Sequence, residues 1–254
     1  MPSWYDQLMD AFTLDNTPLL IAAAVAFFFG YMEYIYPFLL MRREKRDPYP
    51  VWMHTFYLAH DSSWAVIMLL AASRNDWNWF LTTVGIALLV WNVFEVYSIW
   101  HVLTVERQHV YGDYVKGEVT FGKAALLTGI QIPAMYALVW ILIGFMGEGS
   151  IMQWFLFTNM LIAAGPVAFW LKRGATENSR SGLSMGLAVI ILLGTINTFL
   201  PGANMWVLAM PEVFSTPVFY LTGVVFVSIA AFNLWKLSRL PKKVPTAEIP
   251  RPVW

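Results

Sequence analysis

Residues 30–64 read GYMEYIYPFLLMRREKRDPYPVWMHTFYLAHDSSW and join two apolar stretches through a short basic loop. The loop, RREKRDPYP at residues 42–50, contains prolines that cannot continue a helix. Lys and Arg collect in the loops on the inner side of a membrane, so a basic loop between apolar stretches is typical of paired membrane-spanning helices. We therefore expect residues 30–64 to form one corner of a helical membrane bundle.

The composition of the whole chain supports this interpretation. Of its 254 residues, 58% are hydrophobic and only 13% are charged, whereas a soluble domain carries roughly 25% charged residues. The formal net charge is zero, so no basic surface predicts binding to nucleic acid. The absence of cysteine excludes disulfides, thiolate metal sites and a cysteine nucleophile. The fold class that we expect is an all-α, polytopic membrane protein.

Apolar stretches of about 20 residues, long enough to cross a bilayer, recur along the chain. Residues 1–18 lack the pattern of a cleaved signal peptide and predict a short segment at the membrane interface. Residues 19–240 predict one transmembrane domain of seven helices, followed by a C-terminal tail at 241–254. The expected helices are 19–41, 52–73, 78–104, 123–147, 151–171, 183–200 and 213–237.

The positions of the basic residues predict the orientation of this bundle. With the N-terminus outside and the C-terminus inside, every one of the 16 Lys and Arg residues except Arg74 falls on the inner side. Such a bias is the positive-inside pattern of membrane proteins. The sequence predicts an integral membrane protein, of a bacterial inner membrane or of the endoplasmic reticulum in a eukaryote, and leaves its oligomeric state open.

Charged side chains inside membrane helices are costly, so they are candidates for function. Glu33 lies nine residues before the basic loop, Asp61 nine residues after the second helix begins, and Glu95 nine residues before residue 104. Since a helix rises 1.5 Å per residue, all three acids are expected roughly 13 Å from the inner interface. We predict a polar chamber between helices one, two and three, with catalytic roles for Glu33, His60, Asp61 and Glu95.

Helical spacing predicts which neighbours line this chamber. Tyr57, Asp61 and Trp64 follow His54 at i+3, i+7 and i+10, which is one stripe of a helix. On the third helix Asn92 shares a face with Glu95, and the aromatic side chains would shield positive charge that develops on a substrate. The expected substrate-binding residues are Tyr34, Tyr57, Trp64, Trp91, Asn92 and Gln131.

Several structural alternatives stay open for these residues. Glu33 could make an interhelical hydrogen bond, and Asp61 could form an ion pair with His60 that is only structural. Glu95 could be a structural partner of either histidine, while His54 and His101 are expected at the membrane interface. We expect no cofactor. A divalent metal is not excluded, although the ligand spacing within single helices does not favour one. A b-type haem between two helices is a weaker alternative.

The sequence also resembles the small integral-membrane terpene cyclases of fungal meroterpenoid and indole-diterpene pathways, which have seven spans and a similar length. The resemblance rests on residues 30–64, on SRSGLSMGLAVIILLGT at 179–195 and on FVSIAAFNLWKL at 226–237. Within the second-span motif N-x-x-W-E of that family, Asp61 stands at the Asn position and Trp64 at the Trp position. The resemblance implies a protonation-initiated cyclase.

Two departures from the family pattern change where the acid is expected. Ala65 occupies the place of the catalytic Glu, and Ala230 lies near the place of the last-helix Asp. The acid would then be Asp61, supported by Glu95 and Glu33, with His60 tuning the acid or acting as the base. The expected function is acid–base cyclisation or isomerisation of a lipophilic, isoprenoid-type substrate that enters from the membrane lipids. The alternatives are a proton-coupled transporter, a metal-dependent membrane enzyme using the same carboxylates, and a non-catalytic membrane subunit.

Overall fold

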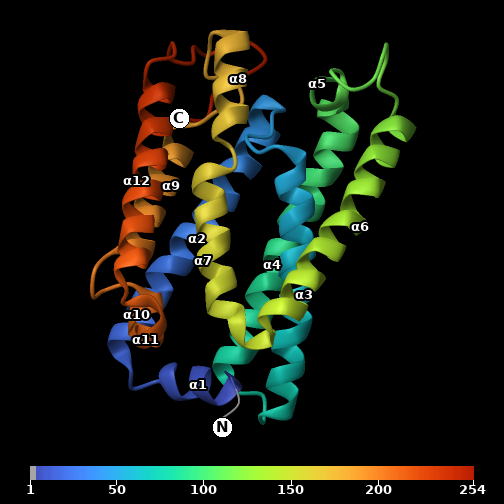
Figure 1. Ribbon diagram of the computed structural model, residues 1–254. Coiled ribbons are helices and arrows are strands. Elements are labelled where there is room, and N and C mark those ends of the chain that lie inside the picture. Colours follow the sequence, from blue (N-terminus) through green and yellow to red (C-terminus); the bar gives the residue numbers. More distant parts are fainter. Residues whose placement is uncertain (1–3) are drawn as a thin grey trace. The chain divides into compact units, whose positions relative to one another are not determined.

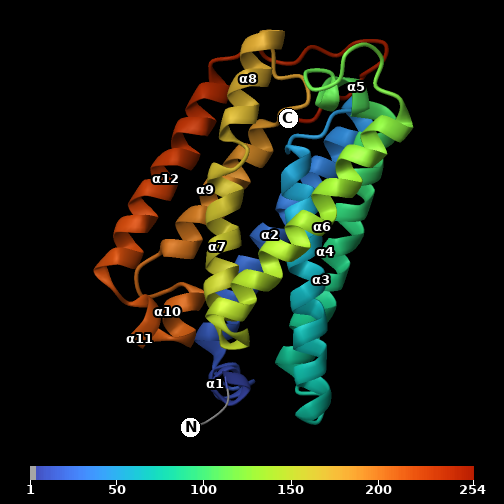
Figure 2. The ribbon, with the colours of Figure 1, turned by 45° about the vertical axis from the view of Figure 1, so that its right-hand side comes forward.

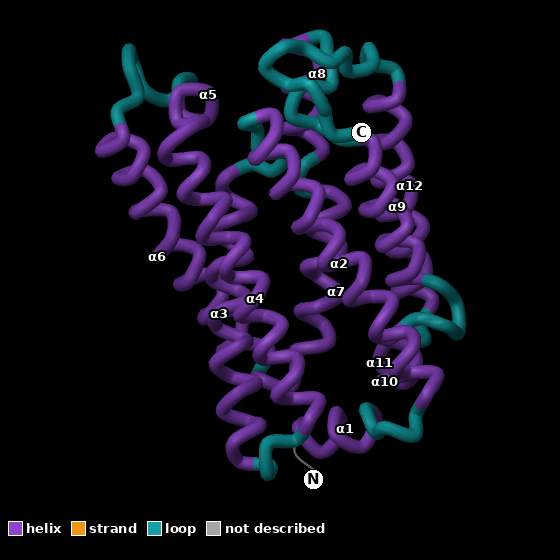
Figure 3. The backbone as a smooth tube through the Cα atoms, turned by 180° about the vertical axis from the view of Figure 1, so that it is seen from behind, coloured by secondary structure: helices purple, strands orange, loops and turns teal. Residues whose placement is uncertain are grey.

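The computed structural model describes residues 4–254, and within that range the regular structure is helical, with no strand (Figure 1, Figure 3). Each of the seven expected ranges falls on helix, so the all-α prediction is confirmed. The first half of the chain contains α1 (Trp4–Ala11), α2 (Thr17–Glu44), α3 (Val51–Arg74), α4 (Trp79–His101), the π-helix η1 (Val102–Glu106), α5 (Arg107–Tyr111) and α6 (Phe121–Met146). The second half contains the 3-10 turn η2 (Glu148–Ser150), α7 (Ile151–Ala164), α8 (Val167–Glu177), α9 (Met185–Phe199), α10 (Met205–Ala209), α11 (Pro211–Phe214) and α12 (Pro217–Ser238).

Within the described residues, five helical stretches are long and apolar enough to cross a membrane. They are Thr17–Glu44, Trp79–Tyr111, Phe121–Met146, Glu148–Glu177 and Pro217–Ser238. The 15-residue α9 is apolar but shorter. The 24-residue α3 is long enough but carries several ionisable side chains. The chain is a membrane protein by these features, while the count of seven spans, the orientation and the membrane itself stay predictions.

Two of the expected ranges cross a break, since 213–237 includes Ser215 and Thr216 between α11 and α12. The fifth range, 151–171, is divided into α7 and α8 at Gly165 and Pro166. Proline lacks the backbone N–H that a helix interior requires, and its ring clashes with the preceding turn. By contrast, Pro37 and Pro133 lie within the continuous helices α2 and α6, as membrane helices tolerate.

The chain divides into two compact units. The first contains α1, α2 and everything from Ile151 onward, and the second runs from Lys45 to Ser150. In the first unit α9 packs against α2, α7 and α12. A methyl group on Gly186 would lie 2.4 Å from Tyr36 Cε1, so this glycine permits the close approach of α9 to α2.

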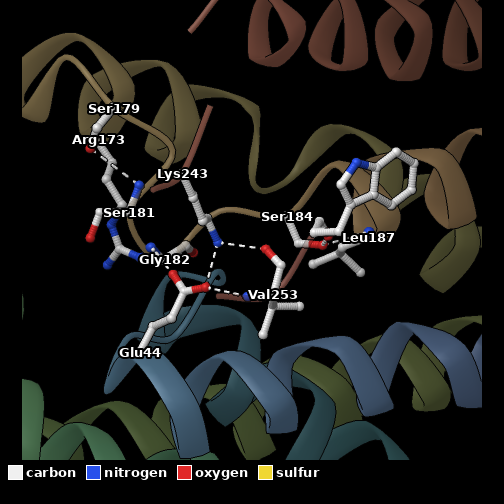
Figure 4. Close-up of polar contacts among 10 residues, drawn as sticks. Glu44, Arg173, Ser179, Ser181, Gly182, Ser184, Leu187, Lys243 and Val253 are labelled. Carbon is white, nitrogen blue, oxygen red and sulfur yellow. Dashed lines mark hydrogen bonds and ion pairs between the residues drawn. The ribbon is translucent and has the colours of Figure 1, made fainter. Parts of the chain in front are cut away.

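A C-terminal strap, residues 241–254, is bound to the first unit through Glu44 at the end of α2 (Figure 4). The buried Glu44 carboxylate accepts hydrogen bonds from Lys243 Nζ at 2.6 Å, Val253 N at 2.8 Å and Gly182 N at 3.0 Å. Burial lowers the pKa of Lys243 below its ordinary value, and the carboxylate of Glu44 offsets part of this shift. Ser184 Oγ donates to the backbone oxygen of Trp254. The strap thereby joins the end of α2 to the start of α9.

In the second unit α3 packs along α4 and against α6 (Figure 2). Pro50 precedes the first turn of α3, where its missing N–H costs nothing. Asn78 caps α4 by accepting from the backbone N–H groups of Phe80 and Leu81. Most of the α3 residues between Met53 and Trp64 are buried, which explains how this helix can carry ionisable groups. The second unit therefore contains a largely apolar helix whose ionisable side chains before its last turn are buried.

Candidate functional site in the second unit

His60 and Asp61 form a pair in the middle of α3. His60 Nδ1 lies 2.7 Å from Asp61 Oδ1, and both side chains are only 2% exposed. The imidazole also stacks on Phe56, with ring centroids 6.0 Å apart and an interplanar angle of 21°. An ionised carboxylate accepts from Nδ1–H, which fixes the orientation of the ring. This pair can therefore hold and transfer a proton in largely apolar surroundings.

A second histidine, His54, lies between two carboxylates at the start of α3. Its Nδ1 is 2.6 Å from Glu95 Oε2 of α4, and its Nε2 is 3.0 Å from Asp47 Oδ2 of the preceding loop. The side chains of all three are at most 4% exposed. Removing one partner of such a buried arrangement leaves an uncompensated charge. We call Asp47, His54 and Glu95 the His54 cluster.

Contacts from η1 hold the loop residue of the His54 cluster in place. Asp47 N donates to Glu106 Oε2, and Tyr49 N donates to Asp47 Oδ1 at 3.0 Å. Glu106 also lies 3.8 Å from Arg46 and 3.7 Å from Nε2 of His101. Single π-helical turns inside α-helices are frequent at functional sites, and this one brings Glu106 onto the loop that carries Asp47.

The structure places Glu95 beside a histidine, one of the alternatives above, rather than level with Asp61. We expected Glu95 level with Asp61, on the assumption that the third helix ends near residue 104 level with the start of the second. The helix instead continues through η1 and α5 to Tyr111, so its end projects past the start of α3. Glu95 consequently lies beside His54, which we had expected at the membrane interface and which is buried.

Glu33 belongs to the first unit. It is 9% exposed, and its Oε1 lies 3.3 Å from the position that a methyl group on Gly194 of α9 would occupy. Glu33 thus faces the contact between α2 and α9. Tyr34 is half-buried in the same helix. The chamber shared by Glu33, Asp61 and Glu95 stays a prediction.

The predicted binding residues of the second unit lie on three packed helices. Tyr57 and Trp64 are buried on α3, while Trp91 of α4 is partly buried. The buried atoms Asn92 Oδ1 on α4 and Gln131 Oε1 on α6, together with Ser63 Oγ, have no hydrogen-bond partner among residues 4–254. Buried polar atoms without partners are costly, so these positions are suited to a ligand with polar groups.

Sequence reasoning missed two members of this site, Asp47 and Glu106. Asp47 was treated only as part of the loop at 42–50, and Glu106 was not among the candidate residues. A signal for Asp47 exists in its position, because the segment between the prolines at 48 and 50 turns the chain back toward α3. Glu106 offered no such signal, since its approach depends on the π-helical turn.

Among residues 4–254, no group of three or more His, Cys, Asp or Glu side chains is arranged to hold a metal ion. Comparison with known proteins finds no matching protein-family model, no matching curated protein and no matching solved structure. The resemblance to membrane terpene cyclases therefore stays an expectation drawn from the sequence.

Proposed function

We propose that this protein is an integral-membrane enzyme that performs acid–base chemistry on a lipophilic, isoprenoid-type substrate. The observation that carries the proposal is the His60–Asp61 pair, buried in the middle of α3 with a 2.7 Å contact between Nδ1 and Oδ1. A protonated carboxyl group in apolar surroundings can act as a general acid. Phe56, Tyr57 and Trp64 place aromatic side chains on the same helix, and aromatic faces stabilise cations.

In the proposed reaction, Asp61 transfers its proton to an epoxide oxygen or an alkene carbon of the substrate. The resulting carbocation is captured by an internal double bond and then loses a proton to water, so that the product is an isomer of the substrate. His60 holds the carboxyl group of Asp61 in position and accepts a proton when the pair is reloaded. The protein exchanges only protons with the substrate, the new bond uses the electron pair of the substrate's own double bond, and no oxidant or reductant takes part.

The distribution of ionisable groups favours an enzyme over a transporter. Beyond Asp61, α3 carries no acid or base until Arg74 near its end, and α4 carries none before Glu95. In α6 the only ionisable side chains are Lys123 in the first turn and Tyr136. Proton-coupled transporters need a path for protons across the membrane. A series of ionisable side chains that ends at Asp61 instead suits an acid that regains its proton from one side of the membrane.

The test uses purified protein in detergent and two farnesyl phenols, one with a terminal epoxide and one with the corresponding alkene. We expect the wild type to convert at least one probe to an isomer of unchanged mass. Asp61→Asn should reduce the rate by at least about 100-fold, the usual contribution of a general acid. Asp113→Asn, an exposed acid of the same unit, is the matched control and should retain the wild-type rate.

Unchanged conversion by Asp61→Asn would remove this residue from the mechanism. Failure of the wild type to convert either probe, together with proton uptake by proteoliposomes that Asp61→Asn abolishes, would favour the transporter instead.

A further inference from the structure

The contacts of His54 determine how many protons the His54 cluster holds. Each ring nitrogen faces a carboxylate oxygen, at 2.6 Å for Glu95 and 3.0 Å for Asp47. The Nδ1 contact with Glu95 is a hydrogen bond and places one proton between the two atoms, whereas Nε2 and Asp47 Oδ2 lie within ion-pair distance. With both carboxylates ionised, an imidazolium at His54 carries its second proton on Nε2, the nitrogen that faces Asp47.

The charges around His54 favour this state. Asp47 approaches from the loop and Glu95 from α4, and Glu106 of η1 lies behind Asp47. The basic groups on these elements are Lys45 and Arg46 of the loop and His101 of α4; Arg46 lies 3.8 Å and His101 Nε2 3.7 Å from Glu106. Three buried carboxylates therefore face one permanently charged basic side chain, that of Arg46, besides the two histidines. Nearby opposite charges stabilise a charged group, so the acids retain the second proton on His54.

The His54 cluster lies on the same helix stripe as the proposed acid. Asp61 follows His54 by seven residues, which is roughly 10 Å along the helix and too far for direct transfer. Tyr57 lies between them on that stripe, three residues after His54 and four before Asp61. Its hydroxyl group can both donate and accept a hydrogen bond. Along the sequence of this stripe, a tyrosine therefore lies between the His54 cluster and Asp61.

We propose that Asp47, His54 and Glu95 form a proton-holding site that reloads Asp61 after each catalytic cycle, with the Tyr57 hydroxyl between them. The holding site stands on the contacts of His54 alone, and the reloading step rests on the proposed function. In that step His54 releases one proton toward Asp61 and regains one from the side of the loop. The cluster is then back in its starting state with no net change of charge.

The holding site is tested by nuclear magnetic resonance on protein with ¹⁵N-labelled histidine, in which His54→Gln identifies the signals of this ring among the four histidines. At pH 8 a free histidine, with its pKa near 6.5, is neutral. We expect both nitrogens of His54 to carry protons at pH 8 in the wild type. Glu95→Gln should leave it mostly neutral, whereas Glu118→Gln, an exposed acid of the same unit, should change nothing.

A neutral His54 at pH 8 in the wild type would overturn the proposal, and this result needs no variant to fold. An imidazolium that persists unchanged in both Asp47→Asn and Glu95→Gln would overturn it as well, because the two carboxylates would then not be its cause.

The reloading step is tested by burst kinetics with the epoxide probe. Asp47→Asn should complete the first turnover at the wild-type rate and slow the following turnovers by about tenfold or more, whereas Asp61→Asn should lose the first turnover too. Later turnovers at the wild-type rate in Asp47→Asn would refute reloading. If Asp61→Asn keeps full conversion, the proposed function fails, while the resonance experiment still decides the holding site.

Discussion

Replacing Glu44 with alanine should release the C-terminal strap from the first unit. The carboxylate is 2% exposed and accepts from two backbone N–H groups, those of Gly182 and Val253, and from Lys243 Nζ. Hydrogen bonds to charged groups contribute about 1.5–3 kcal/mol each. Lys243 keeps its bond to the backbone oxygen of Val253 and can also turn to solvent, and Gly182 lies outside the strap, so we count only the Val253 donor. The strap should lose about 2 kcal/mol of binding free energy.

Hydrogen exchange measured by mass spectrometry on protein in detergent micelles checks this value. Since 1.4 kcal/mol is a factor of ten in an equilibrium constant, the amides of residues 241–254 should exchange about 30-fold faster in Glu44→Ala. Glu248→Ala is the matched control, because it removes the same side chain from an exposed position in the strap. Equal exchange rates in Glu44→Ala and the wild type would refute the reasoning. So would an equal acceleration in both variants.

Two further substitutions test the packing within each unit. Gly186→Ala places a methyl group against the ring of Tyr36 and should lower the stability of the first unit by about 1–3 kcal/mol. Thermal unfolding followed by tryptophan fluorescence should show a lower midpoint, which adding Tyr36→Ala should partly recover. An unchanged midpoint would contradict the close packing. Tyr111→Phe removes a hydroxyl 2.5 Å from Thr128 Oγ1. It should lower the free energy of unfolding by only about 1 kcal/mol, because Thr128 keeps its bond to the Ala124 backbone oxygen. A loss above about 3 kcal/mol in the same assay would contradict this and indicate that the hydroxyl supports further hydrogen bonds.

The helices themselves could be predicted from the sequence because their signals are local. Prolines at 48 and 50, the capping side chains of Asn78 and Thr120, and the long apolar stretches all act within a few residues of the helix ends that they determine. Pro166 was a signal of the same kind and was overlooked, which is why the expected helix at 151–171 is interrupted. The buried pair of His60 and Asp61 was equally accessible, since neighbours in sequence need no knowledge of the fold.

The partners of Glu95 and Glu44 were decided by tertiary structure alone. Glu95 meets His54 rather than lying level with Asp61 because its helix continues to Tyr111, and the register between two packed helices depends on where both of them end. Glu44 binds Val253, which lies 209 positions further along the chain. Helix formation depends on residues within a turn or two, so the local sequence determines it. Contacts across helices depend on how whole helices pack against one another, which the local sequence does not determine.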